Sequence, residues 1–133
     1  MTGRNANKTL PLHRFLRGYR KSEIIFEEGS TGNEMYLIHT GSIALIKRQG
    51  ADKSVTLAVL RAGDFFGEMA LVDEVPRSLS AVAVKDTQLI VLDRAKFLFI
   101  VQQQPQFALS IMHTLCQRVR DLDRQVSTSG GMP

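Results

Sequence analysis

The residues best suited to binding chemistry are an acid and a base nine positions apart, Glu68 and Arg77. The guanidinium of Arg77 offers planar, paired donors that fit a phosphate group. A phosphate repels a carboxylate, so Glu68 makes sense only as an acceptor of hydrogen bonds from neutral hydroxyl groups on the same ligand. A small molecule with a phosphate and a sugar hydroxyl close together is a nucleotide, and the pair therefore predicts a nucleotide site.

The apolar residues after the acid, Met69, Ala70 and Leu71, predict one helical turn that begins near Glu68. Such a short segment is not stable as an isolated helix, so its neighbours must hold it. The first N–H groups of a helix have no partner within it, and they attract anions. We therefore expect these N–H groups to face the same phosphate as Arg77.

Residues 66–82 resemble the phosphate-binding cassette of the cyclic nucleotide-binding domain family. This family includes the bacterial catabolite activator proteins, the regulatory subunits of protein kinase A and the cyclic nucleotide-gated channels. The residues that fit the family pattern are Phe66, Gly67, Glu68, Met69, Ala70, Leu71, Pro76, Arg77, Ser78 and Ser80. The Glu-to-Arg spacing also matches, whereas Leu79 stands where the family usually has a small residue.

The resemblance implies a role for each part of this cassette. Glu68 would bind the ribose 2′-hydroxyl and Arg77 the cyclic phosphate, with backbone groups near Gly67, Ala70 and Ser78 completing the cradle. The residues expected to touch ligand are Phe66, Gly67, Glu68, Met69, Ala70, Arg77, Ser78 and Leu79. The implied ligand is cyclic AMP first and cyclic GMP second. The serine at position 78 does not by itself distinguish the two nucleotides.

Other interpretations stay open. The cassette could be a structural turn, and a domain of this fold could be an interaction scaffold without a ligand. Jelly-roll folds also host metal enzymes, which need two or three converging histidines and a carboxylate. Only His39, of the histidines at positions 13, 39 and 113, is expected to be able to face the interior, and one ligand does not hold a metal. With no Ser-His-Asp or Cys-His arrangement either, the sequence favours a binding module without a cofactor over an enzyme.

Composition is that of one globular domain: 133 residues, 44% hydrophobic and 23% charged. The net charge of +4 comes from a basic leader, because residues 1–21 hold six bases and no acid. We interpret this leader as a solvated terminus, with a contact to a partner or to lipid as the alternative. No apolar run is long enough for a transmembrane segment and no secretory signal is visible, which favours the cytoplasm. Cys116, the only cysteine, is expected to be a buried small hydrophobe.

Short apolar runs separated by glycines are typical of strands joined by tight turns. The strands are expected at 23–26, 35–40, 42–48, 54–60, 80–85 and 87–92. Helices are expected at 9–19, at 94–102 with Asp93 as its cap, and at 105–126. The predicted fold is mainly β with flanking helices: an eight-stranded antiparallel β-roll or jelly-roll barrel with a short cassette helix, an N-terminal helix and two C-terminal helices. The expected parts are a leader (1–21), the binding domain (22–127) and a flexible tail (128–133).

The last helix carries apolar residues at alternating spacings of four and three: Ala108, Met112, Leu115, Val119, Leu122 and Val126. This seam predicts a homodimer through the helix, with packing on the barrel as the alternative. Arg118 is a candidate lid, because the family commonly closes its pocket with this helix and a guanidinium can stack on a purine.

In bacterial transcription factors of the family this helix leads into a helix-turn-helix domain, which the sequence does not contain, so direct DNA binding is not expected. We expect a sensor that signals to an unknown downstream protein through movement of its C-terminal helix. It would be either a stand-alone domain or a fragment of a longer regulator.

Overall fold

The chain forms two compact units, Met1–Lys96 and Phe97–Pro133. Their structure is a computed structural model that describes residues 12–129, with side chains described from residue 12 to residue 124. The first unit contains all the strands of the described residues and the cassette, and the second contains most of the C-terminal helical segment.

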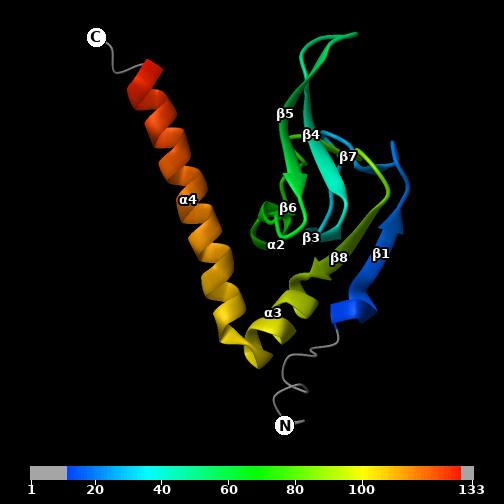
Figure 1. The fold of residues 1–133 in the computed structure, drawn as a ribbon, viewed down its shortest axis with the longest axis vertical. Coiled ribbons are helices and arrows are strands. Elements are labelled where there is room, and N and C mark those ends of the chain that lie inside the picture. The colour runs from blue at the N-terminus through cyan, green and yellow to red at the C-terminus, as the bar shows by residue number, and fades with distance from the viewer. Residues whose placement is uncertain (1–11, 130–133) are drawn as a thin grey trace. The chain divides into compact units, whose positions relative to one another are not determined.

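Eight strands of the first unit form two antiparallel sheets of four strands each (Figure 1). The first sheet has the order β1-β8-β3-β6, with bounds Leu16–Tyr19, Thr87–Asp93, Glu34–Thr40 and Phe65–Phe66. The second has the order β2-β7-β4-β5, with bounds Ile24–Phe26, Ser80–Ala83, Ser42–Arg48 and Ser54–Arg61. The predicted eight-stranded antiparallel β-roll is confirmed, although the sheets are not closed into a barrel.

Side chains from both sheets form one hydrophobic core. Its buried members are Tyr36, Ile38, Ile43, Phe66, Ala81, Ala83, Leu89 and Val91. Three aromatic rings lie together at one part of this core: Tyr36 stacks on Phe66 with centroids 5.0 Å apart, and Phe26 is tilted against both at 5.8 and 5.9 Å. This aromatic cluster of Phe26, Tyr36 and Phe66 supports the candidate site.

The N-terminal helix expected at 9–19 is wrong for most of its length. Leu12–Phe15 form a single 3-10 turn (η1), and Leu16–Tyr19 form strand β1, which pairs with β8. Strand pairing at the edge of a sheet outweighs the weak helical pattern of this segment, because tertiary context overrides local propensity. Residues 1–11 of the predicted leader lie outside the described residues. The two-residue strand β6 was not predicted.

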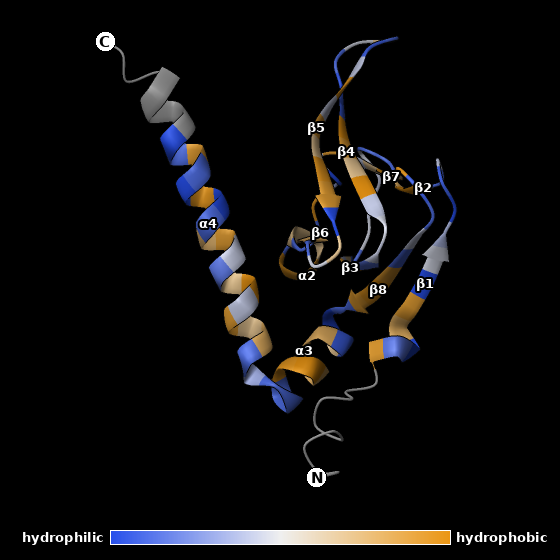
Figure 2. Ribbon diagram, in the orientation of Figure 1, coloured by the Kyte–Doolittle hydropathy of each residue, from blue (hydrophilic) through white to orange (hydrophobic). Residues whose placement is uncertain are grey.

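Both predicted C-terminal helices are present, as α3 (Arg94–Gln103) and α4 (Pro105–Ser129). The backbone N–H of Lys96 donates to the Asp93 carboxylate at 2.9 Å, so Asp93 is the expected cap. Polar and apolar residues alternate along α4 (Figure 2). Cys116 is exposed, so the expectation of a buried cysteine is wrong; the residue lies beside the apolar seam rather than on it.

Within residues 12–129, no helix combines the length and the apolarity needed to cross a lipid bilayer. Of the predicted tail, residues 128 and 129 belong to α4, and residues 130–133 lie outside the described part of the chain.

The turn between β3 and β4 depends on a glycine that has no room for a side chain. Gly41 has a φ of 106°, and a β-carbon there would lie 2.6 Å from the Cα of Thr87. The Thr87 hydroxyl is itself fixed, since it accepts from the Ser42 N–H at 3.1 Å and donates to the Lys85 carbonyl at 2.8 Å. Gly50, at the tip of the β4–β5 hairpin, has a φ of 125°, but a β-carbon there would meet nothing within 4 Å.

Gly41→Ala should therefore lower the free energy of unfolding by about 1–3 kcal/mol more than Gly50→Ala, because only the first adds overpacking to backbone strain. Urea denaturation of the two variants gives the difference. Equal losses would show that the contact with Thr87 does not limit position 41.

Candidate functional site

The cassette begins with a tight turn through Gly67, which has a φ of 77°. Glu68 is the N-cap of α2 (Met69–Val72), and its side chain makes no capping hydrogen bond. The Ala70 N–H donates to the Gly67 carbonyl at 3.2 Å, and the Leu71 N–H donates to the Glu68 carbonyl at 3.1 Å. As expected, these two N–H groups have no partner within α2 itself, but the carbonyls of the two residues before it already accept from them. The charge for an anion must then come mainly from Arg77.

Arg77 is buried, with 8% of its surface exposed. Its Nη1 donates to the Gly67 carbonyl at 3.2 Å, and its Nη2 donates to the Glu34 carbonyl at 2.9 Å. The guanidinium lies over the ring of Phe26, 4.1 Å from its centroid. Arg77 thus bonds to the residue that directly precedes Glu68 in the chain.

The backbone of Arg77 is also fixed, by the loop between β2 and β3. The Gly29 N–H donates to the Arg77 carbonyl at 2.7 Å, and the Arg77 N–H donates to the Ser30 carbonyl at 2.7 Å. The contribution of this loop to the site was not predicted from the sequence, because hydrogen bonds between backbone groups require no particular residue type.

No acid of the described residues neutralises the guanidinium of Arg77. Among the described residues no carboxylate lies within 4.0 Å of it, and its buried Nε has no hydrogen-bond partner. A guanidinium has five N–H donors, and the two carbonyls do not use them all. A buried cation without a counterion is costly, so this position favours an anion.

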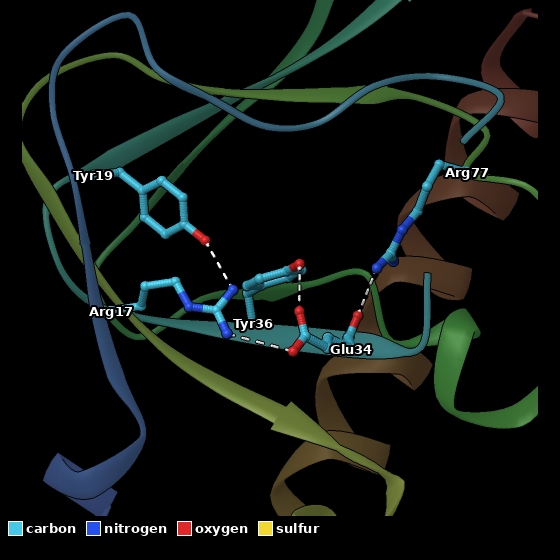
Figure 3. A network of polar contacts seen from close by, with 5 residues as sticks. All are labelled: Arg17, Tyr19, Glu34, Tyr36 and Arg77. Carbon is cyan, nitrogen blue, oxygen red and sulfur yellow. Dashed lines mark hydrogen bonds and ion pairs between the residues drawn. The ribbon is translucent and has the colours of Figure 1, made fainter. Parts of the chain in front are cut away.

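Glu34 lies next to Arg77 but directs its acid elsewhere (Figure 3). Its carboxylate accepts from the Tyr36 hydroxyl at 3.2 Å and from Nη2 of Arg17 at 3.4 Å, while Nη1 of Arg17 donates to the Tyr19 hydroxyl at 3.3 Å. Burial, together with the charge of Glu34, raises the pKa of the Tyr36 phenol, so Tyr36 stays a neutral donor. Only the main-chain carbonyl of Glu34 bonds to Arg77.

A second set of polar contacts fixes the segment after Arg77. Lys47 Nζ donates to the Ser78 carbonyl at 3.2 Å and forms an ion pair with Glu28 at 3.0 Å. The Glu28 N–H donates to the Ser80 hydroxyl at 2.8 Å, and the Glu28 carboxylate accepts from the Arg48 N–H at 2.9 Å. The hydrogen bond from the Arg48 backbone and then that from Lys47 lower the pKa of Glu28. These contacts connect the cassette to the second sheet.

The predicted site residues are distributed unevenly. Phe66, Gly67, Glu68, Ala70 and Arg77 converge around the turn, with Phe66 and Ala70 buried and Glu68 half-buried. Met69 and Ser78 are exposed, and Leu79 is half-buried. Arg118 lies on α4, in the second unit.

A cleft of about 740 Å³ opens beside Arg77. Its lining comes from β2, the loop after it and β3: Ile24, Ile25, Phe26, Glu27, Glu28, Ser30, Thr31, Gly32, Asn33, Glu34, Tyr36 and Arg77. Glu68 does not line this cleft, so a ligand that touches both members of the pair must lie on the cassette side of Arg77.

The metal-enzyme alternative gains no support from the described residues. No group of three or more His, Cys, Asp and Glu residues is placed there to hold a metal ion. His39, which was expected to be able to face the interior, is exposed at the end of β3.

Residues 16–104 match the family described as cyclic nucleotide-binding domain. The chain is 37% identical over 110 residues to the cyclic AMP receptor protein of Thermus thermophilus, an alignment that covers 83% of this chain and 51% of the relative. The crystal structure of Thermus thermophilus catabolite activator protein is similar with a TM-score of 0.80 at 35% identity, over 92% of this chain and 58% of that one. The chain spans about half the length of the curated relatives it matches.

Two structures of the EAL enzyme Bd1971 are also similar, one in a cAMP-bound form and one in a cGMP-bound form. Their TM-scores are 0.59 and 0.60 at 28% and 29% identity. They cover 88% and 83% of this chain, and this chain covers 32% and 29% of theirs.

Arg94, the first residue of α3, holds the far end of the cassette helix. Its Nε and Nη2 both donate to the Leu71 carbonyl, at 2.9 and 2.7 Å, and Nη2 lies 3.5 Å from the Val72 carbonyl. The last carbonyls of a helix lack partners within it, and a cation there also complements the helix dipole. Because α2 is only one turn long, this contact helps to hold it, and Glu68 with it, in place.

Arg94→Ala should lower the free energy of unfolding by about 1–2 kcal/mol and should speed hydrogen exchange at the Asp73 amide, which donates to the Met69 carbonyl. Arg124→Ala is the control, because the ion pair of Arg124 with Asp121 is exposed and should contribute less than about 0.5 kcal/mol. Unchanged exchange at Asp73 in the Arg94 variant would contradict the role given to this side chain.

Proposed function

Because the chain belongs to the cyclic nucleotide-binding domain family, we propose that it is a regulatory binding module, not an enzyme, in which Arg77 takes the phosphate of a cyclic nucleotide. One observation carries the proposal: Arg77 is buried, with no carboxylate of the described residues within 4.0 Å and with its Nε unpartnered. A bound phosphate would supply the missing charge, and it could accept from the Nη N–H groups that the two carbonyls leave unused.

The contacts of Arg77 favour binding without rearrangement. The two carbonyls and the Phe26 ring hold the guanidinium before the ligand arrives, so little side-chain entropy is lost on binding. The acceptors that hold it are neutral carbonyls rather than a carboxylate, so an arriving phosphate displaces no competing anion.

Glu68 is proposed to accept from the ribose 2′-hydroxyl. It is half-buried, follows the glycine whose carbonyl Arg77 binds, and stands at the start of α2, which Arg94 holds from the other end. An acceptor in this position distinguishes a ribose from a deoxyribose, because the 2′-hydroxyl of a ribose can donate a hydrogen bond to it and a deoxyribose has no hydroxyl there.

Cyclic AMP is the first proposed ligand and cyclic GMP the second. The Thermus relative is called a cyclic AMP receptor protein, and Bd1971 is described in both a cAMP-bound and a cGMP-bound form. The rival proposal is a scaffold that keeps the fold and binds no nucleotide. A further proposal is that the bound state is signalled through α4, with Arg118 closing over the base, either in a stand-alone sensor or within a longer regulator.

Arg77 and Glu68 should fail differently when they are replaced. Arg77→Ala should weaken cyclic AMP binding by about 2–4 kcal/mol, because a charge-assisted contact to a largely desolvated phosphate is lost, and Arg77→Lys should restore only part of it. Glu68→Ala should cost about 1–3 kcal/mol. Wild type should bind a 2′-deoxy analogue markedly worse than cyclic AMP, while Glu68→Ala should hardly distinguish the two.

Calorimetric titration of wild type and Glu68→Ala with cyclic AMP and with its 2′-deoxy analogue gives the four affinities that are compared. If wild type ignores the missing hydroxyl, Glu68 has a structural role. If wild type binds no cyclic nucleotide at millimolar concentration, the scaffold proposal replaces this one.

The apolar seam of α4 carries a proposal of its own, a homodimer through this helix. Met112, Val119 and Leu122 expose 58%, 64% and 61% of their surface, and the side chain of Val126 lies outside the described residues. Burial of such a stripe against a second copy would remove apolar surface from water.

Leu122→Asp should shift the chain from dimer to monomer in light scattering at equal protein concentration. Gln117→Asp should not, because it adds the same charge to the same helix away from the seam. If wild type is already monomeric, the seam packs within one chain.

A further inference from the structure

Gly32, in the loop between β2 and β3, lies directly against the guanidinium of Arg77. A β-carbon at position 32 would lie 2.7 Å from Nη2, 3.1 Å from Nε and 3.2 Å from Cζ of Arg77. Real β-carbons essentially never come within 3.0 Å of a heavy atom outside their own residue and its two chain neighbours. No residue with a side chain fits here while Arg77 keeps its place.

The backbone at position 32 does not itself call for glycine. Gly32 has no positive φ, unlike Gly29 and Gly67. What glycine supplies here is room, and the group that needs the room is the side chain of Arg77.

At Nη1 the same guanidinium lies close to a second glycine, Gly67. A β-carbon at Gly67 would lie 2.9 Å from Nη1 of Arg77. The guanidinium therefore lies close to two glycines and over the ring of Phe26, with its Nη groups bonded to the carbonyls of Gly67 and Glu34. It cannot move away from position 32 and keep all of these contacts.

We propose that Gly32 is a positioning residue for Arg77: its missing side chain determines where the guanidinium lies and so which donors it offers to an anion. The inference rests on the proposed function, since the position of the guanidinium matters for phosphate binding. Gly32 lies outside residues 66–82, so the loop after β2 becomes part of the proposed anion site. Gly32 itself contributes no charge to that site.

The proposal separates binding from folding. The atoms that a β-carbon would meet belong to the far end of a long side chain, which can swing away. Gly32→Ala should therefore fold, and it should lose affinity because Arg77 is displaced from its carbonyls and its ring. The loss should appear in ligand binding and also, because Arg77 leaves contacts that it makes without ligand, in the Tm of the ligand-free protein.

The test is a double-mutant cycle of Gly32→Ala and Arg77→Ala in the full chain, read by cyclic AMP affinity and by the Tm of the ligand-free protein. With Arg77 present, Gly32→Ala should weaken binding about tenfold or more. In the Arg77→Ala background, where the space is empty, it should change affinity less than about twofold. Gly18→Ala is the matched control, since a β-carbon there meets nothing within 4 Å and the residue has no positive φ.

The ligand-free Tm keeps the inference testable if the proposed function fails. Displacement of Arg77 should lower the Tm of Gly32→Ala by about 2–4 °C, and the loss should vanish in the Arg77→Ala background. That result supports the positioning role of Gly32 even if wild type binds no cyclic nucleotide. Equal losses of affinity or of Tm in both backgrounds, or no loss in either measurement with Arg77 present, would overturn the proposal.

Discussion

The charge of Arg77 has been taken out of water and left without a counterion among the described residues. Desolvation of a cation is expensive, and neutral carbonyls and an aromatic face offset only part of that cost. The other features of the site make this arrangement possible. The aromatic cluster gives the guanidinium a surface to lie on, Gly67 and Gly32 leave it room, and the loop after β2 fixes its backbone.

The β-roll matters to the site because it joins segments that are distant in sequence. Strand β3 supplies the Glu34 carbonyl, β2 supplies the Phe26 ring and the cassette supplies Arg77 itself. Glu34 also shows how the fold keeps an acid close without neutralising the base, since Tyr36 and Arg17 occupy its carboxylate. The proposed anion site thus depends on both sheets, and the one-turn helix α2 is only one part of it.

Local signals in the sequence predicted much of this structure. Alternating apolar runs located six of the eight strands, and Asp93 and Pro105 located the starts of α3 and α4. Residues 16–19 misled the prediction, because their state depends on pairing with β8, some seventy positions away. The Glu68–Arg77 pair was visible from spacing alone. The sequence did not predict the roles of Gly32, of the Glu34 carbonyl or of the hydrogen bonds from Arg94 to the Leu71 carbonyl. Each of these acts through the backbone or through the absence of a side chain.

If Arg77 binds the phosphate of a cyclic nucleotide, the N–H signals of its own side chain must respond to that ligand. A ¹H–¹⁵N spectrum of the arginine side chains, with Arg77 assigned by its loss in Arg77→Lys, should show the Arg77 Nε–H signal shifting at saturating cyclic AMP, as expected when a charge-assisted hydrogen bond forms to the guanidinium. An Arg77 Nε–H signal that stays in place while other resonances of the protein respond to cyclic AMP would contradict the account.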